Sequence, residues 1–226
     1  MRLENLEFFF EKTEQDAEFK ESLLKESLIW ITKRMFSMSK DMDTDNIQVE
    51  EFSELDDAQS AQAGLDLSLQ QLPPSSVIPG NFYHFLYKPK HRNKLKYYDQ
   101  FPLTLVLKRY DNGFLGLNFH YLDLEYRFAL MSQLWSFVLK DEDGLDEDAY
   151  INIRYKTLET LKGKRFYKPC VKRYLYDQFK SPVYHIPANN WIYALMLPSE
   201  RFFSKNNAKV INKLVHVESK LTIINS

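Results

Sequence analysis

The most informative side chains in this sequence are lysines and arginines that are interleaved with tyrosines. One cluster alternates along a proline-containing loop that runs into two tyrosines, and it comprises Lys88, Lys90, Arg92, Lys94, Lys96, Tyr97 and Tyr98. A second cluster comprises Lys164, Arg165, Lys168, Lys172 and Arg173. Such cations can neutralise phosphates while aromatic rings stack on bases, or they can meet acidic surfaces of neighbouring subunits. The two clusters are therefore predicted to bind a protein partner or DNA.

The histidines do not form a metal-ligand pattern. They are scattered at His84, His91, His120, His185 and His216, without the spacing of a zinc-binding helix. His120 with Asp123 and Glu125 is the best metal candidate, yet a histidine on an alternating strand more commonly makes hydrogen bonds at the rim of the sheet. We therefore predict neither a metal site nor a cofactor.

Nucleophiles and acids give equally little reason to expect catalysis. Cys170 is the only cysteine, so no internal disulfide can form. No base can be assigned to its thiol, so we expect it to be buried or a bystander. Asp99, Asp111 and Asp123 are the acids available for nuclease chemistry, but Asp111 belongs to a turn. The sequence lacks a nucleophile elbow and a phosphate-binding glycine loop, so the protein is not expected to be an enzyme.

Charge is distributed unevenly along the 226 residues. The net charge is −1, but residues 41–79 carry nine acidic side chains and no lysine or arginine, while the residues after them are net basic. An acidic flexible segment can lie across the positive face of its own domain and weaken contacts with other polyanions. It can also be a solvated linker, which is the interpretation we favour.

Residues 1–40 are predicted to form a helical arm. Apolar residues recur there at three- and four-residue spacing, and the face that they form comprises Leu24, Leu28, Trp30, Ile31 and Met35. This face must be buried against the chain's own domain or against a partner helix, and both alternatives stay open. Residues 41–79 are predicted to be the acidic flexible linker, residues 80–204 the main domain, and residues 205–226 a polar C-terminal tail.

The main domain is predicted to be built on strands. They are placed at residues 81–88, 101–110, 114–122, 183–186 and 191–197. Asp111-Asn112-Gly113 supplies a tight hairpin turn, and apolar residues on both sides of the hairpin predict a sheet that is covered on both faces. Helical spacing occurs in residues 124–138, in residues 148–161 and in a segment that begins at Pro169. The predicted fold is α+β, an SH3-like antiparallel β-barrel or curled sheet elaborated with helices, with an unclosed sandwich as the fallback.

Five short motifs follow one another in the main domain. They are G-x-x-Y-x-F-x-Y-x-P-K at residues 80–90, L-x-Y-Y-D-x-F-P-L at 95–103, G-F-L-G-L-N-x-H-Y-L at 113–122, K-P-C-V-K-R-Y-L at 168–175 and W-x-Y-A-x-x-L-P-x-x-x-F at 191–202. Their order resembles a set of proteins encoded by T-even-like contractile-tailed bacteriophages, described as virion structural or DNA-end-protecting proteins. The resemblance implies a non-enzymatic particle component and carries over no catalytic residue.

The leading hypothesis is therefore a structural component of a tailed-phage virion, in the neck, portal or baseplate region. It would dock on other virion proteins in a symmetric multi-subunit assembly. The alternative is a DNA-end or packaging-associated protein that binds double-stranded DNA through the same basic residues, and a nuclease or hydrolase is the third. Because no apolar run approaches the roughly 18–20 residues of a membrane span, we expect no membrane partner and a location in the virion, assembled in the host cytoplasm.

Overall fold

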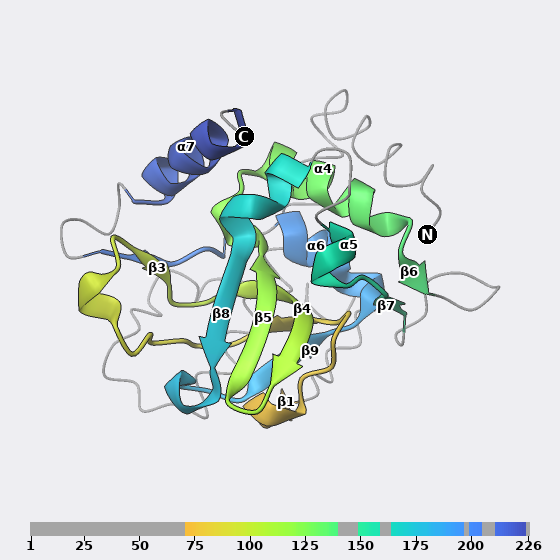
Figure 1. Cartoon of the computed structure of the whole chain (residues 1–226), viewed down its shortest axis with the longest axis horizontal. Coiled ribbons are helices and arrows are strands. Elements are labelled where there is room, and N and C mark those ends of the chain that lie inside the picture. The colour runs from red at the N-terminus through yellow and green to blue at the C-terminus, as the bar shows by residue number, and fades with distance from the viewer. Residues whose placement is uncertain (1–70, 140–148, 159–163, 197–198, 205–210, 225–226) are drawn as a thin grey trace, which may run out of the picture.

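A computed structural model of the chain describes residues 71–139, 149–158, 164–196, 199–204 and 211–224 (Figure 1). The predicted helical arm, with Leu24, Leu28, Trp30, Ile31 and Met35, and the linker up to residue 70 lie outside the described residues. The end of the linker is described: Gln71–Leu72 forms strand β1, Pro74–Ser76 forms the 3-10 turn η3, and Val77 is buried. None of the helices in the described part of the chain is long and apolar enough to cross a membrane.

The predicted hairpin is confirmed. Strand β4 (Leu103–Tyr110) pairs with β5 (Gly113–Asn118), and Tyr110 lies opposite Gly113 across the turn. Gly113 has a positive φ of 156°, and a Cβ at this position would lie 1.9 Å from the carbonyl oxygen of Tyr174. A glycine is therefore needed where the turn meets the neighbouring strand.

The central sheet has six antiparallel strands in the order β1-β9-β2-β4-β5-β8. The strands not yet given are β2 (Phe82–His84), β8 (Val171–Leu175) and β9 (Val183–Ile186). Strands β1 and β8 are its two edges, so among the described strands the sheet is open and the closed SH3-like barrel does not form. Two small sheets pair β3 (Tyr98–Asp99) with β10 (Phe202–Phe203), and β6 (Val138–Leu139) with β7 (Tyr150–Ile151).

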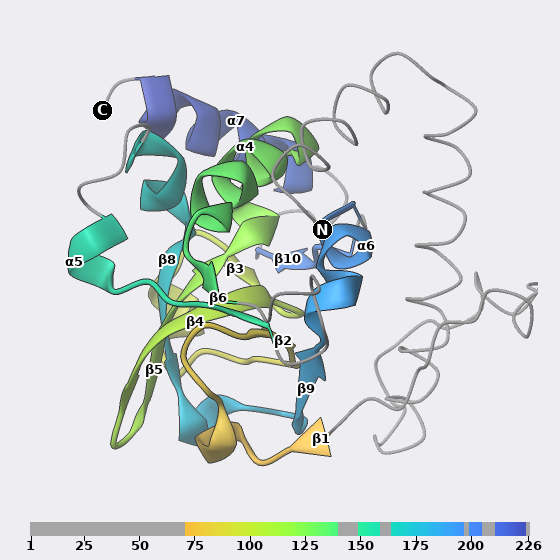
Figure 2. The same cartoon turned by 90° about the vertical axis from the view of Figure 1, so that its right-hand side faces the viewer.

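Both faces of the sheet are covered, as the hairpin pattern predicts. Leu103 and Leu105 point into the main core, while Tyr83 and Val106 point into a second cluster on the opposite face, because side chains alternate along a strand. Helices α4 (Leu124–Trp135) and α6 (Trp191–Met196) supply Phe128 and other residues to the main core. Figure 2 shows these helices and α7 (Ile211–Ile224) gathered at one end of the sheet.

Several segments form a different kind of secondary structure from the one that the sequence predicts. Residues 191–196 form helix α6 rather than a strand, and the Trp191 indole donates to the carbonyl oxygen of Ile186. The helix predicted to begin at Pro169 is the 3-10 segment η6 (Lys164–Cys170) followed by strand β8. The helix predicted at residues 148–161 is replaced by β7 and the short α5 (Tyr155–Leu158). Short apolar runs such as residues 191–196 are ambiguous between buried strand and buried helix, which explains the first of these errors.

The remaining elements are short 3-10 turns and the C-terminal helix. The turns are η4 (Arg92–Lys94), η5 (Phe119–Tyr121), η7 (Tyr176–Gln178) and η8 (Ala188–Asn190). The predicted strand at residues 114–122 ends earlier, at Asn118, where η5 begins, and the predicted helix at residues 124–138 ends at Trp135. Helix α7 buries Val215 and Ile223 in the main core.

Replacing Gly113 with alanine is expected to lower the free energy of unfolding by about 1–3 kcal/mol, because the added Cβ collides with the backbone of β8. Urea denaturation measures the difference. Asp111→Ala changes an exposed residue of the same turn and serves as the matched control. Equal midpoints for wild type and Gly113→Ala would contradict the close approach of the turn and β8.

Candidate nucleic-acid interface

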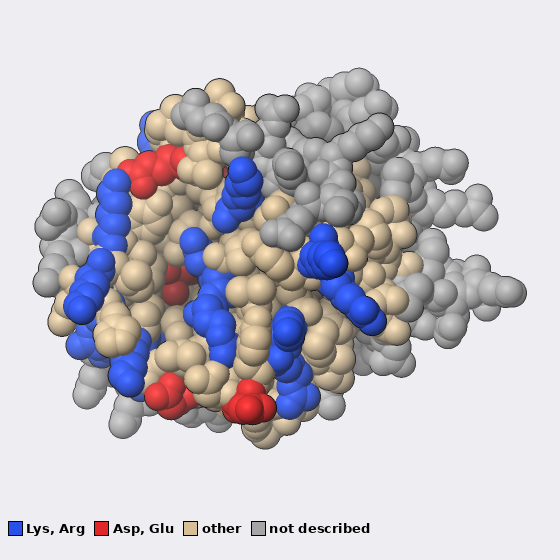
Figure 3. Space-filling model, viewed as in Figure 1, with Lys and Arg blue, Asp and Glu red and all other residues tan. Residues whose placement is uncertain are grey.

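The described side chains of the two predicted basic clusters lie on one face of the molecule. The basic loop, residues 88–96, borders this face, and its five cations (Lys88, Lys90, Arg92, Lys94 and Lys96) are all exposed. Strand β8 carries Lys172 and Arg173 across the middle of the same face. Figure 3 shows lysine and arginine side chains over the basic loop, β8, the β4–β5 hairpin and α5. Lys168 is exposed just before β8, while the side chains of Lys164 and Arg165 lie outside the description.

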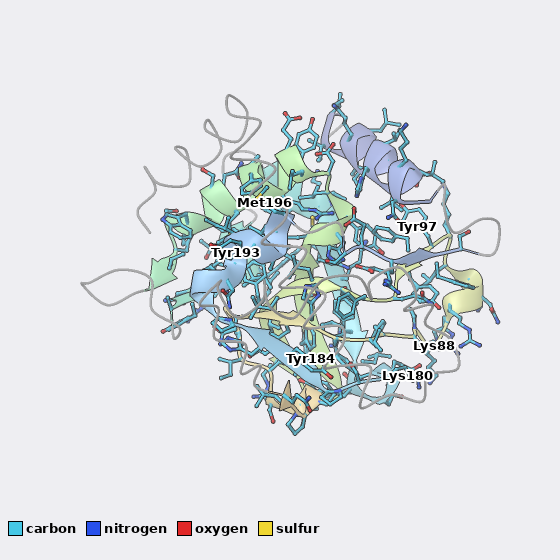
Figure 4. The ribbon with its side chains drawn as sticks, turned by 180° about the vertical axis from the view of Figure 1, so that it is seen from behind. Lys88, Tyr97, Lys180, Tyr184, Tyr193 and Met196 are labelled. Atoms are coloured by element: carbon cyan, nitrogen blue, oxygen red, sulfur yellow. The ribbon has the colours of Figure 1, made fainter. Side chains whose placement is uncertain are left out.

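A pocket of about 490 Å³ separates the basic loop from β8. Its tyrosines are Tyr87, Tyr97, Tyr98, Tyr121 and Tyr174, and we call it the tyrosine pocket. Lys172 and Arg173 line it on the β8 side, and Glu218 lines it from α7. The structure therefore brings both tyrosines of the first predicted cluster together with two cations of the second. Figure 4 shows Tyr97 beneath α7 and Lys88 farther along the same side of the molecule.

Lys172 has an unusual environment for a surface-strand lysine. Its side chain is half-buried, and its Nζ lies 3.8 Å from the centroid of the Tyr121 ring. Burial lowers the pKa of Lys172 below its ordinary value. No carboxylate of the described residues lies within ion-pair distance of Lys172. A cation that is partly desolvated and lacks an anion is suited to receive one from a ligand.

The other cations around the tyrosine pocket are held by protein groups. Arg173 donates to the Asn112 side chain and lies 4.2 Å from the centroid of the Tyr110 ring. Lys96 forms an ion pair with Glu218, and the Tyr97 hydroxyl donates to the same carboxylate at 2.9 Å. Glu218 thus fixes the end of the basic loop against α7. The hydrogen bond from Lys96 lowers the pKa of Glu218.

A buried polar network adjoins the tyrosine pocket through Asp99, which is one of the residues that line it. His120 Nδ1 lies 2.8 Å from Asp99 Oδ2, and His120 Nε2 lies 2.9 Å from Ser199 Oγ. Asp99 also accepts hydrogen bonds from the Asn118 amide and from two backbone N–H groups, those of Phe101 and Arg201. Burial alone would raise the pKa of Asp99, but His120 and these hydrogen bonds outweigh it, and the pKa lies below its ordinary value.

Asp99, His120 and Ser199 are connected in the order of a hydrolase triad, but all three side chains are buried. Ser199 is 6% exposed, His120 is fully buried, and neither lines the tyrosine pocket. A nucleophile must be reachable by the substrate carbonyl or phosphorus atom. As arranged, the network holds β3 and the segment before β10 to the main sheet.

His120 makes hydrogen bonds as the sequence suggests, but in the interior rather than at the rim. Both of its ring nitrogens are engaged, and Asp123 instead accepts from the Tyr126 N–H at the start of α4. The structure does not bring His120, Asp123 and Glu125 together as ligands, and within the described ranges no group of three or more metal-ligating side chains occurs. Cys170 is fully buried, and burial raises the pKa of its thiol to about 12.

Further basic residues of this face escaped the sequence analysis. Lys180 lies beside Lys88, because Lys88 N–H donates to the Gln178 carbonyl and Lys180 N–H donates to the Leu86 carbonyl (Figure 4). A second hollow, of about 600 Å³, is lined by the cations Lys108, Arg109, Arg154 and Lys156. Lys108 and Arg109 lie far from Arg154 and Lys156 in sequence, and only the fold brings the two pairs together.

A family model described as phage T4 terminal DNA protecting protein matches residues 64–218. This span includes the basic loop, β8, the polar network and Glu218 of α7. No curated protein and no solved structure matches the chain.

Asp99→Asn is expected to lower the free energy of unfolding at pH 7 by about 3–5 kcal/mol, because it breaks a buried pair and leaves His120 without its carboxylate. The folded-state pKa of Asp99 is depressed, so its stabilisation is present above the ordinary value of 3.8 and is lost as the pH falls through the folded-state value. The gap between wild type and variant should therefore shrink below about pH 4.

Urea denaturation between pH 3 and 7 measures this gap. Asp177→Asn, which neutralises an exposed carboxylate, should leave the free energy of unfolding nearly unchanged. A gap that stays constant across the whole range would contradict the ionised, hydrogen-bonded state of Asp99.

Proposed function

Because the chain belongs to the phage T4 terminal DNA protecting protein family, we propose that it binds the ends of double-stranded phage DNA through its basic face. The observation that carries this proposal is the convergence of two cation clusters, more than 60 residues apart in sequence, around one tyrosine pocket. Phosphate contacts supply most of the affinity in sequence-independent DNA binding.

The exposed basic loop is suited to the duplex backbone. Lys88, Lys90, Arg92 and Lys94 are exposed and have no ion-pair partner among the described residues. Long, exposed cations can follow the phosphates of a duplex without reading its bases. Lys96 differs because Glu218 already holds its ammonium group.

The family match favours DNA-end binding over a purely structural part of the neck, portal or baseplate, which was the leading sequence hypothesis. We retain the virion as the place of action and the host cytoplasm as the place of assembly, with other virion proteins as neighbours. The proposed role is non-enzymatic, since the one Asp–His–Ser arrangement in the described residues buries its serine.

Reversing two charges of the basic loop tests this role. Lys90→Glu with Arg92→Glu should weaken binding to a short linear duplex and reduce the slope of log K against log salt by about 2, since each lost phosphate contact removes about 0.9. Fluorescence anisotropy across a salt series measures both quantities.

The matched control is Lys213→Glu with Lys220→Glu. These exposed lysines lie seven residues apart on α7, on the helical face opposite Glu218 and Thr222. The control should retain most of the affinity and the wild-type slope. The same loss in both double variants would show a diffuse electrostatic effect and would contradict a role for the basic loop.

A further inference from the structure

We propose that the tyrosine pocket holds the 5′-terminal nucleotide of a DNA strand, with its phosphate on Lys172 and its base against Tyr97. This inference rests on the proposed binding of DNA ends, and it assigns a separate task to a separate part of the basic face. The basic loop binds duplex phosphates, whereas the pocket receives the end group.

The size of the pocket favours one nucleotide over a duplex. Its volume of about 490 Å³ lies in the range of small-molecule sites, roughly 300–1,000 Å³. A duplex is far too wide to enter a pocket of this size. A single nucleotide at the end of a strand can enter once its base pair opens, and opening is least costly where neighbouring bases stack on one side only.

Lys172 is the residue that would bind the 5′-terminal phosphate. It is the pocket cation without a carboxylate or hydrogen-bond partner among the described residues, whereas Arg173 is bound to the Asn112 side chain. The Tyr121 ring covers one side of the Lys172 ammonium group and leaves its remaining donors for a ligand. A terminal phosphomonoester carries up to two charges, more than a phosphodiester within the strand, and it is therefore the preferred anion for this cation.

Tyr97 is the residue on which the terminal base would stack. It is half-buried and its hydroxyl is bound to Glu218, so the ring has a fixed orientation on the pocket wall. Tyr121 is less suitable for stacking because Lys172 already covers its ring face. Stacking on an aromatic ring tolerates every base, so the pocket would accept strand ends of any sequence.

The test compares linear duplexes of one sequence that carry either a 5′-phosphate or a 5′-hydroxyl at each end. The wild-type protein should bind the phosphorylated ends about tenfold more tightly or better, since a charge-assisted contact is lost with the hydroxyl. Lys172→Met keeps the packing of the stem and should remove this preference, while Lys172→Arg should retain part of it.

A second measurement does not depend on any variant. A photoreactive 5-iodouracil at the 5′-terminal position should crosslink to tyrosines of the pocket, and the same base placed ten nucleotides inward should not. Crosslinks confined to the basic loop would overturn the inference.

The outcomes separate this inference from the proposed function. Equal affinity for 5′-phosphate and 5′-hydroxyl ends overturns the pocket assignment while DNA-end binding stands. Absence of binding to either duplex overturns both. A free deoxynucleoside 5′-monophosphate should compete far more weakly than a phosphorylated end, because it lacks the loop contacts. If it binds as tightly as the end, the occupant is a free nucleotide and the inference fails.

Discussion

The burial of the Asp99 carboxylate is the constraint on which the site depends. An ionised carboxylate in the interior is tolerated only when it is fully hydrogen-bonded and paired. Asp99 meets this requirement with groups from three other parts of the chain, namely the end of β5, η5 and the segment before β10. The next two residues on its N-terminal side are Tyr98 and Tyr97, so the same bonds fix the pocket wall.

A second buried pair connects this network to the C-terminal helix. Arg127 of α4 contacts Glu200 at 3.0 Å, and His216 of α7 lies 3.9 Å from the same carboxylate. The Nε2 atom of His216 is also 3.1 Å from the His120 carbonyl oxygen. Because a ring nitrogen facing a carbonyl oxygen must carry the proton, His216 Nε2 is the donor. Helix α7 is thereby held over the pocket, where Glu218 reaches Lys96 and Tyr97.

Local patterns in the sequence predict local structure well. The Asp111-Asn112-Gly113 turn, the alternation of Leu103 and Leu105, and the helical stripe through Phe128 are all found in the structure. Elements fixed by long-range contacts were missed. Residues 171–175 form a strand because β5 offers them an edge, and residues 191–196 form a helix because Trp191 packs into the core.

The candidate site shows the same division. Both basic clusters can be found in the sequence. They lie close together only because β8 pairs with β5, and the spacing of residues along the chain does not predict this pairing. The Asp99–His120–Ser199 network was invisible for the same reason, since 21 and 79 residues separate its members. Polar residues that are far apart in the sequence form no recognisable motif, so the buried network could not be predicted without the fold.

If the basic face recognises the ends of DNA, the protein must distinguish a duplex that has free ends from one that has none. A linear duplex and a duplex of the same sequence closed by hairpins at both ends share the same base-paired phosphates, but only the first has free ends. The protein should bind the linear duplex more tightly than the closed duplex at every salt concentration. Equal affinity for the two would contradict it and would leave only general duplex binding.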